Sequence, residues 1–210
     1  MVCFDDHNRS CFPVLILEIP ANCVTENGRK ITENYLQVGL NKNQKITDTG
    51  IQSNVFRSII HQEFDKDTLE NDIAVLMLEL QIKFLTAILP ICLPEPGILL
   101  DSQGFNVGYQ NEGGLLTVDD MKILSSEECS EADPKFFDTF LNDGNFCAVK
   151  ETTNFCVAEP GSGFYVKNAG LWTLAGIISS SNRRNHCDNH VILTDVTKYL
   201  TWIDESVNSL

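Results

Sequence analysis

The chain has 210 residues, 43% of them hydrophobic, and its 29 acidic and 15 basic residues give a formal net charge of -14. That apolar content is enough for a buried core, and ordinary glycine and proline counts exclude collagen-like sequence and wholesale disorder. Such a negative surface repels polyanions, so nucleic acid and anionic membranes are excluded as expected partners, and protein surfaces or cations are favoured. The same acidity is also what keeps many secreted proteins soluble.

The beginning of the chain has no targeting features. Residues 1–6 lack both a basic region and a long apolar run, so no signal peptide is expected in this chain. The apolar run 13–19 contains Glu18 and is too short to cross a membrane, so no membrane span is expected. The sequon Asn8-Arg9-Ser10 agrees with secretion.

Short apolar runs separated by turn residues dominate the rest of the sequence. They lie at 14–19, 35–38, 73–80, 115–118, 164–166, 171–178 and 191–196. Many short strands with polar punctuation predict an all-β barrel or sandwich. Residues 101–114 are rich in Gly, Asn and Gln, and we expect them to link two halves of the molecule.

Two helices are expected among these strands. Ser125 and Glu128 form a capping-box pattern, which predicts a helix over 125–132. Apolar residues recur at helical spacing within 196–207, which predicts a C-terminal amphipathic helix.

Eight cysteines are spread along the whole chain, at positions 3, 11, 23, 92, 129, 147, 156 and 187. No C-x-x-C pair occurs, which argues against a zinc ribbon or a redox site. His186 and His190 flank Cys187, but loop histidines beside a disulfide are more often simply solvated, so neither a metal nor a cofactor is expected. The even number predicts a disulfide framework formed in an oxidising compartment, and hence a secreted, extracellular protein.

Three segments together resemble a known family. Asn71–Leu76 reads NDIAVL, Pro90–Pro94 reads PICLP, and Gly176–Ser179 is followed by Cys187 and the segment 192–203. In this order they resemble the chymotrypsin-like (peptidase S1, trypsin-like) serine proteases, over about residues 11–207. The joint pattern is specific, although each segment alone is not.

This resemblance implies an all-β fold of two antiparallel six-stranded β-barrels with a C-terminal α-helix. A single peptidase S1-like domain would span 11–207, with the first barrel at about 11–105 and the second barrel and helix at about 106–207. Residues 1–10 would be an N-terminal remnant. Because the sequence before Asn22 is about half the family's usual length, the first barrel is expected to be N-terminally truncated.

The family's catalytic triad uses a histidine that takes the proton of a serine hydroxyl and an aspartate that orients the histidine. The resemblance places Asn22, in Pro20–Cys23, at the histidine position, Asp72 at the aspartate position and Pro160 at the serine position. An amide has no useful basicity, and proline has neither a hydroxyl nor the backbone N–H that forms half of the oxyanion hole. The resemblance thus implies that only the acid of the triad remains.

Further departures from the family pattern agree with this interpretation. Asn154 replaces the aspartate at the base of the trypsin-like specificity pocket, and Ala158 lies at the oxyanion hole, so both mark a degenerate binding region. No Ile-Val-Gly-Gly segment exists, and Glu159 replaces the aspartate that would pair with its amine. His61 matches an ordinary loop histidine of the family. A shifted register would make Ser162 the nucleophile, but it brings no histidine base.

The retained aspartate also leads to a structural prediction. A carboxylate buried between two barrels needs hydrogen-bond donors, because its burial otherwise costs several kcal/mol. The amide of Asn22 carries two donors. We therefore expect a hydrogen bond from Asn22 to Asp72, in place of the lost histidine contact.

The resemblance implies three disulfides, Cys11–Cys23, Cys129–Cys147 and Cys156–Cys187. Cys3 and Cys92 remain, and in related proteases the cysteine of the Cys-Leu-Pro segment often ties an N-terminal extension to the domain. A Cys3–Cys92 bridge completes the expected set.

The sequence thus predicts a catalytically inactive serine protease homologue, or pseudo-protease, that is not an enzyme. It would act as a secreted regulatory or binding protein in an extracellular proteolytic cascade, with cascade proteases or their substrates as partners. Similarity of the segments 162–164 and 172–178 to arthropod members implies an innate immune setting. Two alternatives stay open: an active serine endopeptidase with an atypical site, and a non-functional gene fragment.

Overall fold

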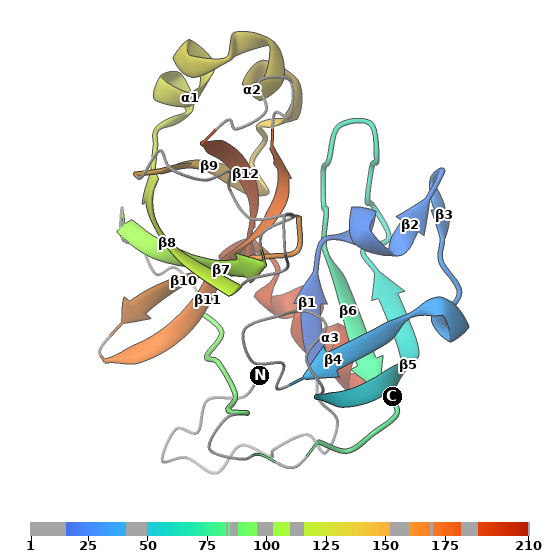
Figure 1. Cartoon of the computed structure of the whole chain (residues 1–210). Coiled ribbons are helices and arrows are strands. Elements are labelled where there is room, and N and C mark those ends of the chain that lie inside the picture. The colour runs from blue at the N-terminus through green and yellow to red at the C-terminus, as the bar shows by residue number, and fades with distance from the viewer. Residues whose placement is uncertain are drawn as a thin grey trace.

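Most strands of the described residues belong to a four-stranded sheet or to a closed barrel, and these two units lie side by side (Figure 1). The computed structural model describes residues 16–40, 50–82, 84, 88–95, 103–109, 116–151, 160–168, 170–181 and 189–209. Each of the seven predicted apolar runs overlaps a strand in this part of the chain. The strands that were not predicted are β5, β7, β9 and the short β2–β3 hairpin, whose bounds follow.

The first lobe is a half-barrel sheet. Its elements are β1 (Ile16–Ile19), η1 (Ala21–Val24), β2 (Thr25–Glu26), β3 (Arg29–Lys30), η2 (Glu33–Tyr35), β4 (Gln37–Leu40), β5 (Ile51–Ile60) and β6 (Ala74–Leu78). Among the described residues the sheet has four antiparallel strands in the order β1-β6-β5-β4, and β2 and β3 form a separate hairpin. This half-barrel is the part of the first barrel that the described residues show.

The second lobe is a closed six-stranded barrel in the order β10-β11-β12-β9-β8-β7. Its elements are β7 (Gln103–Tyr109), β8 (Leu116–Ile123), α1 (Ser126–Ala132), α2 (Pro134–Phe140), β9 (Asn145–Lys150), β10 (Gly163–Asn168), β11 (Leu171–Ser181), β12 (His190–Asp195), η4 (Val196–Lys198) and α3 (Leu200–Asn208). The all-β fold class with a C-terminal helix is therefore confirmed.

The expectation that 101–114 links the two halves is wrong, because Gln103–Tyr109 forms β7, which pairs with both β8 and β10. Its glycine content has a packing cause. A Cβ on Gly104 would lie 2.4 Å from the Cζ of Phe164, whose ring fills the barrel beside it. Glycine here allows a close approach between two strands. A strand with such glycines can have the composition of a linker.

The two short helices beside the second barrel are fixed by their N-terminal caps and by a disulfide. The predicted capping box is present at α1, because Ser125 Oγ accepts from Glu128 N and a Glu128 carboxylate oxygen accepts from Ser125 N. Helix α2, which was not predicted, begins with Asp133 as its cap and a proline at its first position. Cys129 of α1 and Cys147 of β9, an expected pair, form a disulfide. No helix within the described ranges is long and apolar enough to cross a membrane.

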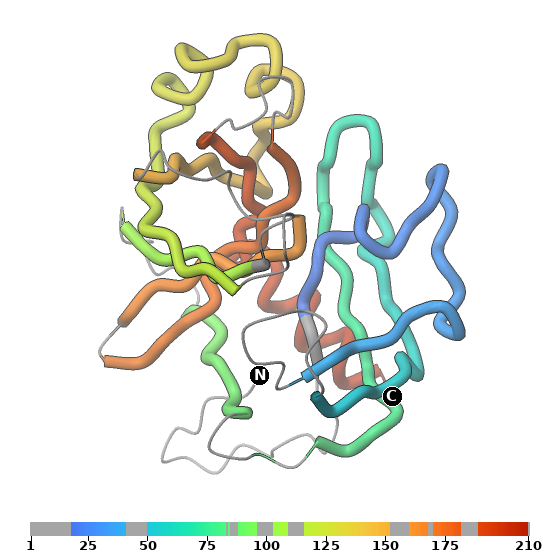
Figure 2. Tube along the Cα trace, viewed as in Figure 1, coloured from blue at the N-terminus to red at the C-terminus, as the bar shows by residue number. Residues whose placement is uncertain are grey.

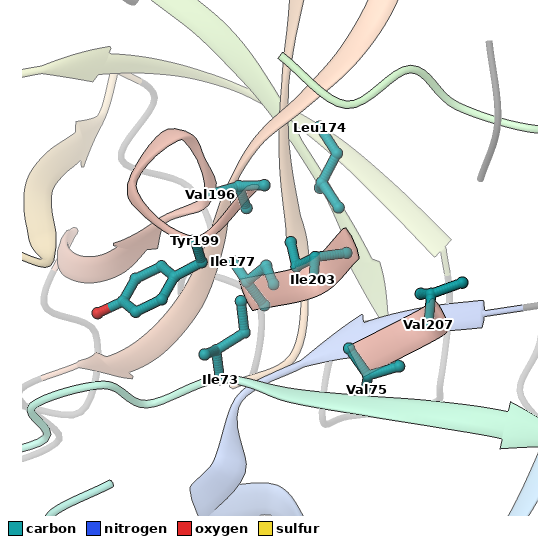
Figure 3. Packing of buried hydrophobic residues seen from close by; sticks show 8 residues of the cluster. All are labelled: Ile73, Val75, Leu174, Ile177, Val196, Tyr199, Ile203 and Val207. Carbon is teal, nitrogen blue, oxygen red and sulfur yellow. The ribbon is translucent and has the colours of Figure 1, made fainter. Parts of the chain in front are cut away.

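One apolar core joins the two lobes (Figure 3). The first lobe contributes Ile73 and Val75, β11 contributes Leu174 and Ile177, and the C-terminal segment contributes Val196, Tyr199, Ile203 and Val207. After β12 the chain therefore returns to the first lobe, where α3 packs against β6 (Figure 2). This core fixes the junction at which Asp72 lies, one residue before Ile73.

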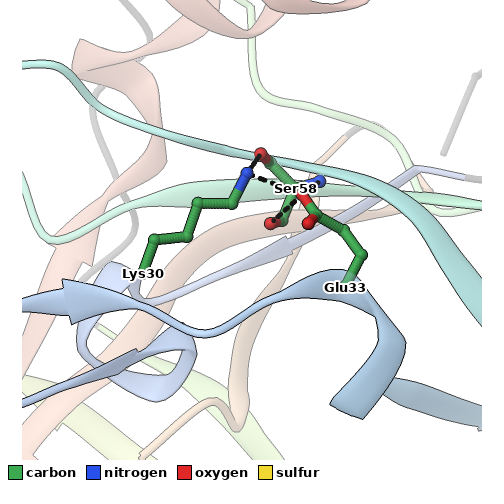
Figure 4. A network of polar contacts seen from close by, with 3 residues as sticks. All are labelled: Lys30, Glu33 and Ser58. Carbon is green, nitrogen blue, oxygen red and sulfur yellow. Dashed lines mark hydrogen bonds and ion pairs between the residues drawn. The ribbon is translucent and has the colours of Figure 1, made fainter.

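A small polar network holds the loop after β3 against β5 (Figure 4). Glu33 accepts hydrogen bonds from the backbone N and the hydroxyl of Ser58, at 3.0 and 2.9 Å. Lys30 pairs with Glu33 at 2.6 Å and also donates to the carbonyl of Ser58. The hydrogen bond from Lys30 is the main reason that the pKa of Glu33 falls to about 2.

Candidate functional site

Asp72 lies at the lobe junction with only 1% of its surface exposed. It comes directly before Ile73 and β6, and it follows Asn71, whose φ of 53° is in the left-handed region that asparagine tolerates better than most residues. Thr194 Oγ1 on β12 donates to the backbone carbonyl of Asp72 at 2.8 Å. The second barrel therefore fixes the position of this first-lobe carboxylate.

Asn22 and Ser179 donate three hydrogen bonds to the Asp72 carboxylate. The backbone N of Asn22 donates to Oδ1 at 2.8 Å, and Asn22 Nδ2 donates to Oδ2 at 2.8 Å. Ser179 Oγ also donates to Oδ2, at 2.5 Å. The hydrogen bond expected between Asn22 and Asp72 is thus present, and the carboxylate is well supplied with partners.

Burial still dominates the acidity of Asp72. Removal from water raises its pKa from 3.8 to about 6, although the hydrogen bonds from Ser179 and the backbone oppose this shift. The donors from Asn22 and Ser179 are neutral, so they stabilise the charged carboxylate less than a cationic partner would. Near neutral pH, Asp72 is therefore ionised although its burial disfavours the charged form.

Asn22 lies in the 3-10 turn η1, which follows β1 after Pro20. Its Nδ2 donates both to Asp72 Oδ2 and to the carbonyl of Ser179, at 3.1 Å. Both N–H groups of the amide are therefore used at the junction. An amide held in this way orients Asp72 and Ser179, but it offers no basic nitrogen that could accept a proton.

The turn Pro160–Ser162 lies against the same region. Gly161 N donates to the carbonyl of Ile178, and Ile178 N donates to the carbonyl of Ser162, both at 2.8 Å. Gly161 has a φ of 97°, and a Cβ at this position would lie 3.9 Å from the Sγ of Cys23, the neighbour of Asn22. The structure thus brings the turn that carries Pro160 close to Asn22, Asp72 and Ser179.

Neither described histidine takes part in this network. His61 is 8% exposed and packs between Tyr199 and Trp202, with ring centroids 5.6 and 5.1 Å away. Burial lowers its pKa. His190 lies on β12 against Phe137. Within the described residues, no group of three or more His, Cys, Asp or Glu side chains could hold a metal ion.

The sequence interpretation missed Ser179, which is 2% exposed and donates to Asp72. The available signal was a hydroxyl at the end of the apolar run 174–178. A buried side-chain hydroxyl needs a hydrogen-bond partner, and the retained aspartate is an acceptor that needs donors.

Several predicted residues lie outside the described part of the chain. These are Cys3, Cys11, Asn154, Cys156, Ala158, Glu159 and Cys187. The degenerate specificity pocket and oxyanion hole, and the pairs Cys11–Cys23 and Cys156–Cys187, therefore stay predictions. Cys92 is in a disulfide, and its partner lies outside the described residues.

Comparison with known proteins identifies the family. The Trypsin family model matches residues 20–203. Vitamin K-dependent protein C of Mus musculus is 26% identical over 163 residues, which cover 69% of this chain and 35% of the relative. Transmembrane protease serine 11A of Homo sapiens is 29% identical over 173 residues, which cover 76% of this chain and 40% of the relative. The chain spans about two fifths or less of the length of these relatives.

The family match and the fold agree with each other. The matched residues run from the turn that carries Asn22 to α3, and they include Asp72, Pro160 and Ser179. The closed barrel, the half-barrel sheet and the C-terminal helix are consistent with this family's fold. This chain therefore belongs to the trypsin family of serine proteases.

Proposed function

We propose that this chain is a catalytically inactive member of its family, in which Asn22, Asp72 and Pro160 stand at the three triad positions. The observation that carries the proposal is the amide of Asn22, which spans Asp72 Oδ2 and the carbonyl of Ser179. A histidine base would make its contact with the aspartate at this place. The amide keeps that contact and removes the proton acceptor.

The second loss concerns the nucleophile. Pro160 lies next to Gly161, whose backbone N donates to the carbonyl of Ile178 beside Ser179, and a proline ring carries no attacking oxygen and no backbone N–H. Without triad members, a site of this kind retains only about 10³- to 10⁴-fold catalysis over water, from binding and the oxyanion hole. A proline at the nucleophile position also removes one donor of the oxyanion hole, which lowers the residual catalysis further.

The biological role proposed is that of a secreted regulatory or binding protein in an extracellular proteolytic cascade. Family membership, the disulfides at Cys92 and Cys129–Cys147, and the net charge of -14 support this role. Partners would be cascade proteases or their substrates, and an innate immune setting follows from the arthropod resemblance of the sequence. The acidic surface favours partners with a basic face, since opposite charge speeds association.

A fluorophosphonate probe tests the proposal directly. The probe forms a covalent bond with an activated serine, so the purified oxidised protein should remain unlabelled while an active trypsin-type protease labels fully under the same conditions. Labelling would be read by intact-protein mass spectrometry, where a single adduct on most of the chain would contradict the proposal.

The Ser162→Ala variant separates inactivity from the alternative of an atypical active site. Ser162 is the nucleophile in the shifted register, and its carbonyl, not its hydroxyl, forms the hydrogen bond to Ile178. If the native chain were labelled and Ser162→Ala were not, the chain would be an active endopeptidase that uses this serine. No label on either protein agrees with the inactive homologue.

A further inference from the structure

A pocket lies between the two lobes, and we name it the junction pocket. Its volume is about 400 Å³, which is within the range of about 300–1,000 Å³ that ligand sites occupy. The first lobe contributes the loop before β6, the second barrel contributes the turn between α2 and β9, and the residue before α3 contributes a phenol ring. The lining residues are Glu70, Asn71, Asn142, Asp143, Gly144 and Tyr199.

Hydrogen bonds fix both walls of the junction pocket. On the first-lobe side, Asn71 Nδ2 donates to the carbonyl of Glu63 at 3.0 Å. On the barrel side, Asn142 Oδ1 accepts from Gly144 N at 2.9 Å. The carbonyl of Gly144 in turn accepts from Asp195 N at 3.0 Å. The pocket is therefore formed before a ligand arrives, so little conformational freedom would be lost on binding.

The Tyr199 hydroxyl reaches the junction pocket from the apolar core between the lobes. Tyr199 is 6% exposed, and its hydroxyl points away from the other side chains of that core (Figure 3). The hydroxyl donates to Asn71 Oδ1 at 3.3 Å, and a Cβ on Gly144 would collide with it. No described residue donates a hydrogen bond to the hydroxyl oxygen. A nearly buried acceptor without a donor therefore lies at this pocket.

The charge of the junction pocket is negative. Glu70 and Asp143 line it from opposite lobes and are exposed. Within the described ranges neither carboxylate takes part in an ion pair or a hydrogen bond. Burial first, and then nearby carboxylates that include Asp195 and Glu70, raise the pKa of Tyr199 to about 12. The phenol therefore stays protonated, and none of the six lining residues carries a positive charge.

We propose that the junction pocket binds the guanidinium group of an arginine side chain on a partner protein. A guanidinium has five N–H donors and no acceptor, and the pocket offers acceptors on two opposite walls. Its planar fork can bond to both walls at once, whereas an ammonium is a compact and strongly hydrated charge. Two carboxylates are few for Ca²⁺, which takes about six to eight oxygen ligands. The site suits the basic partner proposed above, but it does not depend on whether the chain is catalytic.

An NMR titration of the oxidised full-length protein tests this site. The probe is Nα-acetyl-L-arginine methylamide, whose blocked ends leave only the side-chain charge. It should shift the side-chain amide signals of Asn71 and Asn142 in a saturable way. Glu70→Gln and Asp143→Asn should each weaken its binding about threefold to fivefold, the effect of losing one exposed charge pair. Asp120→Asn, a change of the same charge at an exposed position of β8, should leave the binding unchanged.

The two pocket variants lie on opposite lobes, so either one tests the proposal if the other fails to fold. Absence of a saturable shift would overturn it. Equal weakening by Asp120→Asn would also overturn it, because the attraction would then belong to the acidic surface as a whole. Equal affinity for Nα-acetyl-L-lysine methylamide would contradict the assignment to a guanidinium. Displacement of the probe by micromolar CaCl₂ would assign the pocket to a metal ion instead.

Discussion

Phe164→Ala should lower the free energy of unfolding by about 3–5 kcal/mol, as is typical when a fully buried aromatic ring is removed from a core. Phe164 is 0% exposed and its ring packs against Phe146 at a centroid distance of 5.8 Å. Gly104 has no side chain to fill the space that the ring would leave. Urea denaturation followed by circular dichroism would measure the change.

Phe56→Ala is the matched control, because it removes the same side chain from a position that is 65% exposed. Its effect should stay within about 0.5 kcal/mol, as for most surface substitutions. Phe164 also follows the turn that carries Pro160, so its loss should loosen that turn first. Equal effects of the two variants would show that the barrel interior around Phe164 repacks, which is contrary to the tight contacts described here.

The native protein should gain stability from Asp72 as the pH falls from about 7 to about 4. The folded state raises the pKa of Asp72 from 3.8 to about 6, so in this window it binds a proton more strongly than the unfolded chain does. The stabilisation is fully present below pH 3.8 and is lost as the pH rises through about 6. A shift of about two pKa units corresponds to about 3 kcal/mol.

Comparison with Asp72→Asn isolates this contribution, because all other titrating groups are shared by the two proteins. On acidification, the difference in unfolding free energy should move by about 3 kcal/mol in favour of the native chain. Asp138→Asn, on the exposed face of α2, should differ from the native protein by no more than about 0.5 kcal/mol throughout. A difference for Asp72→Asn that runs in the opposite direction would mean that the donors outweigh burial.

The sequence predicted the parts of the fold that have strong local signals. The capping box at Ser125 predicted α1, and the apolar runs predicted strands. Both signals are local, because capping and hydrophobic alternation depend on residues only a few positions apart. β7 was mistaken for a linker because Gly104 is explained only by its close approach to Phe164, sixty residues along the chain. The β2–β3 hairpin was missed, although Asn27 and Gly28 both have the positive φ of a tight hairpin turn.

In the candidate site, too, one contact was predicted from sequence and another was missed. The contact between Asn22 and Asp72 was predicted because the chemistry of a buried carboxylate demands donors. The part played by Ser179 was not, since it depends on β11 and the chain before β6 being brought together across the lobe junction. Patterns in sequence report what a residue needs, whereas only the three-dimensional arrangement decides which partner supplies it.

The apolar core that joins the two lobes has a consequence for how the molecule is made. Its side chains come from β6, β11 and the segment from Val196 to Val207, so it cannot be completed until α3 has been synthesised. During translation, Ile73 and Val75 of the first lobe would stay exposed until α3 packs against them. Exposed apolar side chains of this kind make the growing chain prone to aggregation. Packing of α3 would then complete the core between the two lobes.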